Sequence, residues 1–208
     1  MYRTLGVQGP KVPVICLGTW PLGGGMGVLD KNQVVKTVHA SIDAGVTFID
    51  TAESYLSSEE SLGEALEGRR NKVFLATKLS GDHSIAHIKK ALEQSIKTLK
   101  CDYIDLYQIH DPPHDVAYTC ELFMLLDDLV AEGKIRHYGA AITQDIDFEM
   151  GVLGLLNRTN VAALQVPFNV IDYEQDNKIL SLAEEKRTGL IARLSNAMMQ
   201  NPQEAHYG

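Results

Sequence analysis

Short runs of apolar residues alternate along this chain with longer segments in which apolar residues recur every three or four positions. The short runs are rich in Val, Ile and Leu, which favours β-strands, and the longer segments have the spacing of amphipathic helices. Strands are predicted near 14–18, 46–50, 73–77, 103–109, 137–141, 162–166 and 189–193. Helices are predicted near 31–44, 58–67, 84–99, 116–132, 145–157 and 174–187. This alternation is typical of successive βα units and indicates an α/β fold with a parallel sheet.

Residues with capping preferences mark several of the predicted helix boundaries. Asp30, Ser84 and Asp145 each precede a helix-like segment, where a side-chain oxygen accepts a hydrogen bond from a free backbone N–H. Gly45 and Gly133 follow two of these segments, where a residue with positive φ commonly ends a helix. The helix boundaries are therefore supported by local chemistry as well as by hydrophobic spacing.

The two ends of the chain depart from the alternating pattern. YRTLG at 2–6 and the stretch from Pro10 to Pro13 predict a short N-terminal β-hairpin, which could cover the bottom of a barrel. Residues 195–208 show neither strand alternation nor a helical stripe, as a truncation or a shifted reading frame would produce. We therefore expect a single barrel domain over residues 1–194 and an unrelated tail over 195–208.

Composition and charge exclude several classes of partner. The chain has 19 Lys and Arg against 27 Asp and Glu, a net charge of −8, and no basic stripe of the kind that binds nucleic acid. No window approaches the ~18 apolar residues of a membrane span. The three cysteines, Cys16, Cys101 and Cys120, have no disulfide-framework spacing. A reducing, cytoplasmic location is predicted, with no nucleic acid and no membrane among the partners.

Four residues able to act together on a carbonyl group fall at or just past the C-terminal ends of separate strand-like runs: Asp50, Tyr55, Lys78 and His110. A phenol is a weak acid, with a reference pKa of about 10, and a nearby ammonium favours its phenolate. Lys78 could supply that charge, Asp50 could hold Lys78, and His110 could donate a hydrogen bond to a carbonyl oxygen. This set suits carbonyl reduction, with the hydride coming from a bound cofactor.

The segments that carry these residues resemble the aldo-keto reductase family over about residues 2–194. The matching text is RTLG near the start, then LGTW, GVTFIDTAESY, ATK, DYIDLYQIH, LVAEGKIRHYG and LQVPFN. The resemblance implies a TIM-type (β/α)₈ barrel with NADP(H) across its C-terminal face. The barrel would be incomplete here, with seven strands and six helices. The resemblance also implies that Tyr55 is the general acid or base, that Lys78 and Asp50 tune it, and that His110 orients a small-molecule carbonyl substrate.

The same resemblance assigns cofactor contacts. Gly18, Thr19 and Trp20 match the segment beside the nicotinamide ribose, which Asp50 also approaches, and Gln165 matches the glutamine that binds the carboxamide.

Three positions depart from the family pattern. Ala141 and Ile142 replace a Ser-Asn pair that hydrogen-bonds the carboxamide in the family, and the change at Ala141 is expected to cost about 1 kcal/mol of cofactor binding. Arg193 stands where many members have a tyrosine that stacks on the nicotinamide, although some relatives also carry arginine there.

Other readings of these motifs are weaker, and no metal site is predicted. The glycines between Gly23 and Gly27 do not fit the GxGxxG that opens a helix in a dinucleotide-binding unit, so a substrate loop is favoured. His83 and His87 have the spacing of paired zinc ligands but no evident third ligand. The cluster of His110, Asp111, His114 and Asp115 is interpreted as a loop held by its prolines.

Two hypotheses for function follow. The first is an NADPH-dependent reductase of aldehydes or ketones, also able to run the reverse oxidation. The second is an inactive or regulatory relative that keeps these residues and acts as a binding module. The presence of all four candidate catalytic residues, Asp50, Tyr55, Lys78 and His110, favours the reductase hypothesis. The second is favoured because the loops that grip the cofactor phosphates in barrel enzymes, after strands seven and eight, do not occur in this sequence.

We predict that the 208-residue chain binds NADPH weakly or not at all and tends to self-associate through the edges of its first and seventh strands. Trp20 is the only tryptophan, so quenching of its fluorescence during an NADPH titration measures the affinity. Saturation at low micromolar NADPH would contradict this prediction.

Overall fold

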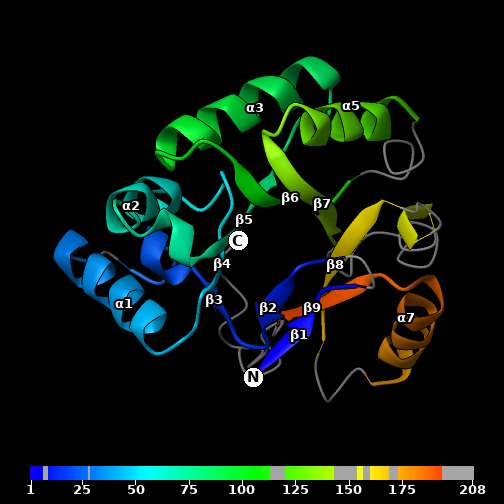
Figure 1. Cartoon of the computed structure of the whole chain (residues 1–208), viewed down its shortest axis with the longest axis horizontal. Coiled ribbons are helices and arrows are strands. Elements are labelled where there is room, and N and C mark those ends of the chain that lie inside the picture. The colour runs from blue at the N-terminus through cyan, green and yellow to red at the C-terminus, as the bar shows by residue number, and fades with distance from the viewer. Residues whose placement is uncertain are drawn as a thin grey trace, which may run out of the picture.

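The strands form one curled, parallel sheet with helices on its outer side (Figure 1). This computed structural model describes residues 1–6, 9–27, 29–112, 120–142, 154–156, 160–168 and 173–193, without the side chains of 173–178. The sheet has the order β3-β4-β5-β6-β7-β8-β9, so each strand lies beside its neighbour in the sequence. The strands are β3 (Cys16–Gly18), β4 (Phe48–Asp50), β5 (Phe74–Leu79), β6 (Ile104–His110), β7 (Ile135–Ala141), β8 (Val161–Pro167) and β9 (Gly189–Arg193). All seven predicted strands are confirmed.

The helices lie in the crossovers between these strands, as a parallel sheet requires. They are α1 (Lys31–Asp43), α2 (Ser58–Ala65), α3 (Ile85–Thr98), α5 (Cys120–Ala131) and α7 (Tyr173–Lys186), with short 3-10 turns η1 (Pro21–Gly23) and η2 (Arg70–Lys72). Asp30 caps α1 and Ser84 caps α3, as predicted. Gly45 and Gly133 have φ values of +86° and +76° just after α1 and α5. The cap at Asp145 and most of the helix predicted at 145–157 lie outside the described residues.

Two hydrophobic cores lie on opposite faces of the sheet, because alternate residues of a strand point to opposite sides. The outer core, between sheet and helices, includes Val38, Leu75, Leu92, Tyr107, Leu126 and Leu164. The inner core, inside the curl, comprises Leu5, Val12, Phe48, Ala76, Leu106, Ala163 and Ile191. Burial on both faces explains why the strands are almost continuously apolar.

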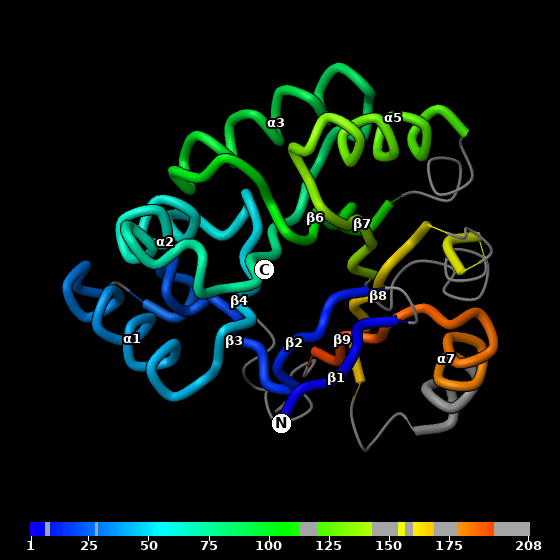
Figure 2. Tube along the Cα trace, in the orientation of Figure 1, coloured from blue at the N-terminus to red at the C-terminus, as the bar shows by residue number. Residues whose placement is uncertain are grey.

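The N-terminal hairpin closes one end of the inner core. Strands β1 (Tyr2–Thr4) and β2 (Lys11–Pro13) pair antiparallel, and Figure 2 places them at the end of the curl beside β8 and β9. Leu5 and Val12 are 6% and 5% exposed and pack against inward-facing residues of the sheet. Gly6, with φ +68°, lets the chain approach Gly189 so closely that a Cβ would lie 3.0 Å from the Gly189 nitrogen. The predicted hairpin and its position are confirmed.

The fold is therefore an incomplete (β/α)₈ barrel, as predicted. Within the described residues, β3 and β9 are the end strands of the sheet. Association of chains through these two strands stays a prediction. The tail at 195–208 lies outside the described residues, and the boundary of the barrel domain at 194 stays a prediction. None of the helices within the described ranges combines the length and the apolar character needed to cross a bilayer.

Strands β7 and β8 approach closely at Gly139, next to an irregularity in their register. A Cβ at Gly139 would lie 2.2 Å from the carbonyl oxygen of Ala163, a backbone atom that cannot turn away. We expect Gly139→Ala to lower the free energy of unfolding by ~1–3 kcal/mol, the usual cost of overpacking, as measured by urea denaturation.

Gly18→Ala is the matched control, because it makes the same change on a strand where nothing lies within 4 Å of the added carbon. Equal losses of stability in the two variants would show that the contact with Ala163 has no special cost.

Candidate active site

The C-terminal ends of the strands bring the predicted chemical groups to one rim of the curl. Asp50 is the last residue of β4, Lys78 lies one residue before the end of β5, and His110 is the last residue of β6. Tyr55 follows β4 in the loop that leads to α2. Parallel strands point their C-terminal ends the same way, so residues far apart in sequence meet here.

The Lys78 side chain is completely buried and uses its three protons on three partners. Nζ donates to Asp50 Oδ2 at 2.5 Å, to the Thr51 carbonyl oxygen at 2.9 Å and to the Tyr55 hydroxyl oxygen at 3.4 Å. An ammonium has three donors and no acceptor, so the Tyr55 oxygen must accept in this contact. The hydroxyl hydrogen of Tyr55 is therefore directed elsewhere.

The Asp50 carboxylate links Lys78 to two glutamines of the barrel interior. Its Oδ1 accepts from Gln108 Nε2 at 2.9 Å and from Gln165 Nε2 at 3.2 Å, while Oδ2 faces Lys78. Asp50 is 6% exposed, and a buried charge of this kind is stable only when it is paired and hydrogen-bonded. Asp50 has both kinds of partner.

Aromatic packing fixes the position of the Tyr55 ring. Lys78 Nζ lies 4.8 Å from the ring centroid, and the Trp20 indole meets the ring edge-to-face at a centroid distance of 5.3 Å. The indole in turn lies against Gly25, where a Cβ would come within 2.1 Å of it. Trp20 is 41% exposed, so the indole borders the open side of the site.

Three buried hydroxyl groups join the segments after β3 and β4 to α2. The Ser58 hydroxyl lies 2.8 Å from Thr19 Oγ1 and 2.9 Å from Thr51 Oγ1. Thr19 also donates from Oγ1 to the Asp50 carbonyl oxygen at 2.9 Å. These bonds hold the backbone from Asp50 to Tyr55 in place. The Thr19 hydroxyl is thus engaged within the protein, and its contact with a cofactor stays a prediction.

His110 lies beside the cluster, with Lys78 and Asp50 among its electrostatic neighbours. Its Nδ1 is 3.2 Å from Ser80 Oγ, and its Nε2 is 3.6 Å from Asp111 Oδ2. The His83 Nε2 lies 3.0 Å from the His110 carbonyl oxygen and donates to it. Burial lowers the pKa of the His110 ring below its ordinary value, although the Asp111 carboxylate acts in the opposite direction. Burial therefore favours the neutral form of the ring.

The residues at the rim fit a polar ligand such as the nicotinamide end of NADP(H). The Gln108 Oε1 and the Arg193 Nε are buried polar atoms without a protein partner among the described residues. Gly18 ends β3 beside Asp50, and the space where its side chain would lie is open. Ala141 and Ile142 are buried and apolar at the end of β7, so the Ser-Asn contacts of the family pattern are absent at these two positions.

Comparison with known proteins decides the family. The sequence model of the aldo/keto reductase family matches residues 14–197. The chain belongs to this family. It is similar to the aldo-keto reductase YhdN of Bacillus subtilis (strain 168), with 33% identity over an alignment of 204 residues that covers 89% of this chain and 59% of YhdN. The chain thus spans about three fifths of the length of this relative.

Two solved structures support the same assignment. A putative aldo-keto reductase from Pseudomonas aeruginosa is 27% identical with a TM-score of 0.81, covering 92% of this chain and 77% of that protein. An aldo/keto reductase from Klebsiella pneumoniae, solved in complex with NADP and acetate, is 30% identical with a TM-score of 0.74. That match covers 95% of this chain and 71% of that protein.

No group of three or more His, Cys, Asp or Glu side chains in the described part of the chain could hold a metal ion. His83, one of the two histidines with zinc-like spacing, instead binds the His110 backbone. His114 and Asp115 lie outside the described residues.

Sequence reasoning missed several residues that support the site. Gln108 holds Asp50, and Ser58 ties together two loops. The signal for Gln108 was present, because Leu106, Gln108 and His110 alternate along β6 and therefore share its inward face. Ser80, which contacts His110, follows directly after β5.

The lowered pKa of His110 predicts a pH dependence of stability. The ring of the unfolded chain takes up a proton near its ordinary pKa of 6.5, before the folded chain does. The free energy of unfolding should therefore decrease as the pH falls through about 6.5 and recover as the pH rises. Urea denaturation of the parent and His110→Asn at about pH 7.5 and about pH 5.5 measures the effect.

We expect a smaller difference between the two pH values in His110→Asn, because every other titrating group is common to both proteins. The His137 pKa is also lowered by burial, so part of the difference remains in the variant. An unchanged pH difference would mean that folding does not lower the pKa of His110.

Proposed function

We propose that this chain is an NADPH-dependent oxidoreductase that reduces an aldehyde or ketone to an alcohol, and that Tyr55 is its general acid. The observation that carries this proposal is the contact between Lys78 Nζ and the Tyr55 hydroxyl oxygen at 3.4 Å. Family membership supports the reaction class, and the complex of the Klebsiella relative with NADP supports the cofactor.

The direction of the hydrogen bonds suits proton donation. Since Lys78 donates to the Tyr55 oxygen, the hydroxyl hydrogen of Tyr55 is available to a carbonyl oxygen at the rim. As that proton leaves, negative charge develops on the phenol oxygen, next to a buried ammonium that is already in place. Asp50 keeps Lys78 in this position through the 2.5 Å ion pair. The reverse oxidation uses the same phenolate as a base.

His110 positions the substrate in this proposal by donating a hydrogen bond to the carbonyl oxygen. NADPH, when bound, supplies the hydride that adds to the carbonyl carbon. Gly18, Thr19, Trp20, Asp50 and Gln165 would hold its nicotinamide end, and the unpartnered Gln108 Oε1 and Arg193 Nε add hydrogen-bonding capacity there. The substrate is a small carbonyl compound that enters at the rim bordered by Trp20.

A non-catalytic relative that only binds small molecules is the second candidate. The apolar Ala141 and Ile142 favour it, because they remove hydrogen bonds to a carboxamide. Cytoplasmic location stays a prediction for both candidates.

Tyr55→Phe tests the mechanism because it removes only the hydroxyl. We expect reduction of a reactive aldehyde to fall by at least ~10²-fold, in line with the contribution of a general acid. The assay follows NADPH absorbance at millimolar cofactor, since weak cofactor binding is predicted. The control is Tyr2→Phe, which makes the same change at an exposed residue of the hairpin.

Turnover that survives Tyr55→Phe would remove Tyr55 from the mechanism. If the parent chain binds NADPH but shows no turnover with any aldehyde or ketone of a broad panel, the binding-module alternative is correct.

A further inference from the structure

Arg193 places a positive charge at the rim beside the candidate catalytic groups. It is the last residue of β9, and its side chain is partly exposed. Burial is the first cause of the lowered pKa of His110, and the charges of Lys78 and Arg193 lower that pKa further. Arg193 is therefore close enough to His110 for its charge to act there.

Most hydrogen-bond donors of Arg193 have no partner in the described part of the chain. A guanidinium has five N–H donors and no acceptor. Nη2 donates to the Ile142 carbonyl oxygen at 3.3 Å, and the buried Nε has no partner. By contrast, Arg70 is paired with Asp105 at 2.7 Å. Among the residues that the structure describes, no carboxylate pairs with Arg193, so its charge is left for a ligand.

We propose that Arg193 is a specificity-determining residue that binds the carboxylate of an oxo-acid substrate, an aldehyde or ketone that also carries a carboxylate. This inference rests on the proposed function and names the substrate class. The planar guanidinium presents parallel N–H groups, which match the two oxygens of a carboxylate. With the carbonyl group at Tyr55 and His110, the carboxylate binds Arg193 and fixes the orientation of the substrate.

The backbone holds Arg193 in position without using its side chain. The Arg193 carbonyl oxygen accepts from the Phe168 N–H at 3.0 Å, and Arg193 lies beside Pro167 in the register of β8 and β9. Ile142, whose carbonyl oxygen accepts from Nη2, is fixed by its N–H, which donates to the Gln165 carbonyl oxygen at 2.9 Å. The guanidinium therefore reaches from β9 across the end of β8 to the residue after β7.

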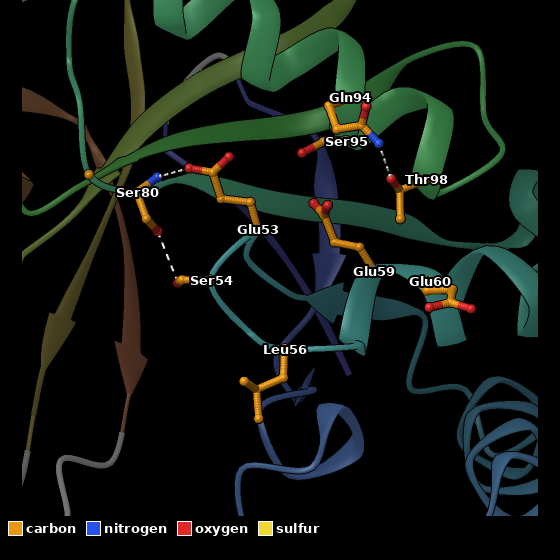
Figure 3. A pocket seen from close by; sticks show the side chains of 10 residues that line it. Glu53, Ser54, Leu56, Glu59, Glu60, Ser80, Gln94, Ser95 and Thr98 are labelled. Carbon is orange, nitrogen blue, oxygen red and sulfur yellow. Dashed lines mark hydrogen bonds between the residues drawn. The ribbon is translucent and has the colours of Figure 1, made fainter. Parts of the chain in front are cut away.

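The surface beside the Tyr55 loop, at α2 and α3, has the opposite charge. A cavity of about 560 Å³ is lined there by Glu53, Glu59 and Glu60, and no Lys or Arg lines it within the described residues (Figure 3). The Glu53 Oε1 accepts from the Ser80 N–H at 2.5 Å, a bond drawn in Figure 3. Because like charges repel, an anionic group of a ligand is disfavoured in this cavity and favoured at Arg193.

Nitrogen NMR of the complete chain labelled with ¹⁵N-arginine tests the carboxylate site without turnover. The Nε–H signal of Arg193, identified by its loss in Arg193→Lys, is followed during titration with benzoate, both with and without NADP⁺. We expect a saturable shift with benzoate and none with benzamide, which has the same shape without the charge. The absence of any shift with benzoate overturns the proposal. A shift with inorganic phosphate but not with benzoate assigns Arg193 to the cofactor phosphates and also overturns it.

Reduction of a matched pair of aldehydes tests the consequence for specificity. We expect the parent to have a higher kcat/KM for p-formylbenzoate than for its methyl ester. Arg193→Gln should lower the ratio of these two values by at least ~10-fold, the usual effect of losing a hydrogen bond to a charged group. The ratio cancels changes in cofactor binding, which affect both aldehydes equally.

Two further variants make this result specific. Arg193→Lys keeps the charge without the planar fork and should retain part of the preference. Arg187→Gln removes the same charge at an exposed position before β9 and should leave the ratio unchanged. An equal ratio in the parent and in Arg193→Gln overturns the proposal even when both aldehydes are reduced. If neither aldehyde is reduced while benzoate still shifts the Arg193 signal, the proposed function fails and the carboxylate site stands.

Discussion

The buried ion pair between Lys78 and Asp50 is the constraint on which the rest of the site depends. An ammonium with no exposed surface is stable only if all of its protons are accepted, and here a carboxylate, a backbone carbonyl and a phenol accept them. This requirement determines where the loop after β4 must run, since that loop supplies the carbonyl of Thr51 and the hydroxyl of Tyr55. The same bonds that neutralise a buried charge therefore set the position of the Tyr55 hydroxyl.

Most of the fold could be predicted from the sequence, because each strand is a short apolar run and each crossover helix has a clear stripe. The meeting of Asp50, Lys78 and His110 then follows from parallel topology alone. The supporting contacts could not be predicted in the same way. The hydroxyls of Thr19 and Ser58 are 39 residues apart, and no local pattern shows that they meet. Gln108 differs from them, because its alternation with Leu106 and His110 along β6 does indicate that it shares their face.

The residues of the site differ in how far their side chains are exposed to solvent. Lys78 and Asp50 are enclosed by the strands, whereas Trp20 and Ser54 lie exposed at the rim. Between them, Tyr55 and His110 are partly buried, so each has one side facing fixed protein groups and the other facing solvent. The charged pair therefore lies among the strands, and Tyr55 and His110 lie at the boundary with solvent.

The N-terminal hairpin packs against one end of the inner core, and the candidate site lies at the other end of the same strands. Leu5 and Val12 cover the end where the strands begin, whereas Asp50, Lys78 and His110 lie near the opposite ends of their strands. Residues near the beginnings of the strands therefore pack against the hairpin and form the inner core. Evolutionary change in ligand preference can accumulate at one end of the curl while the other end continues to hold the protein together.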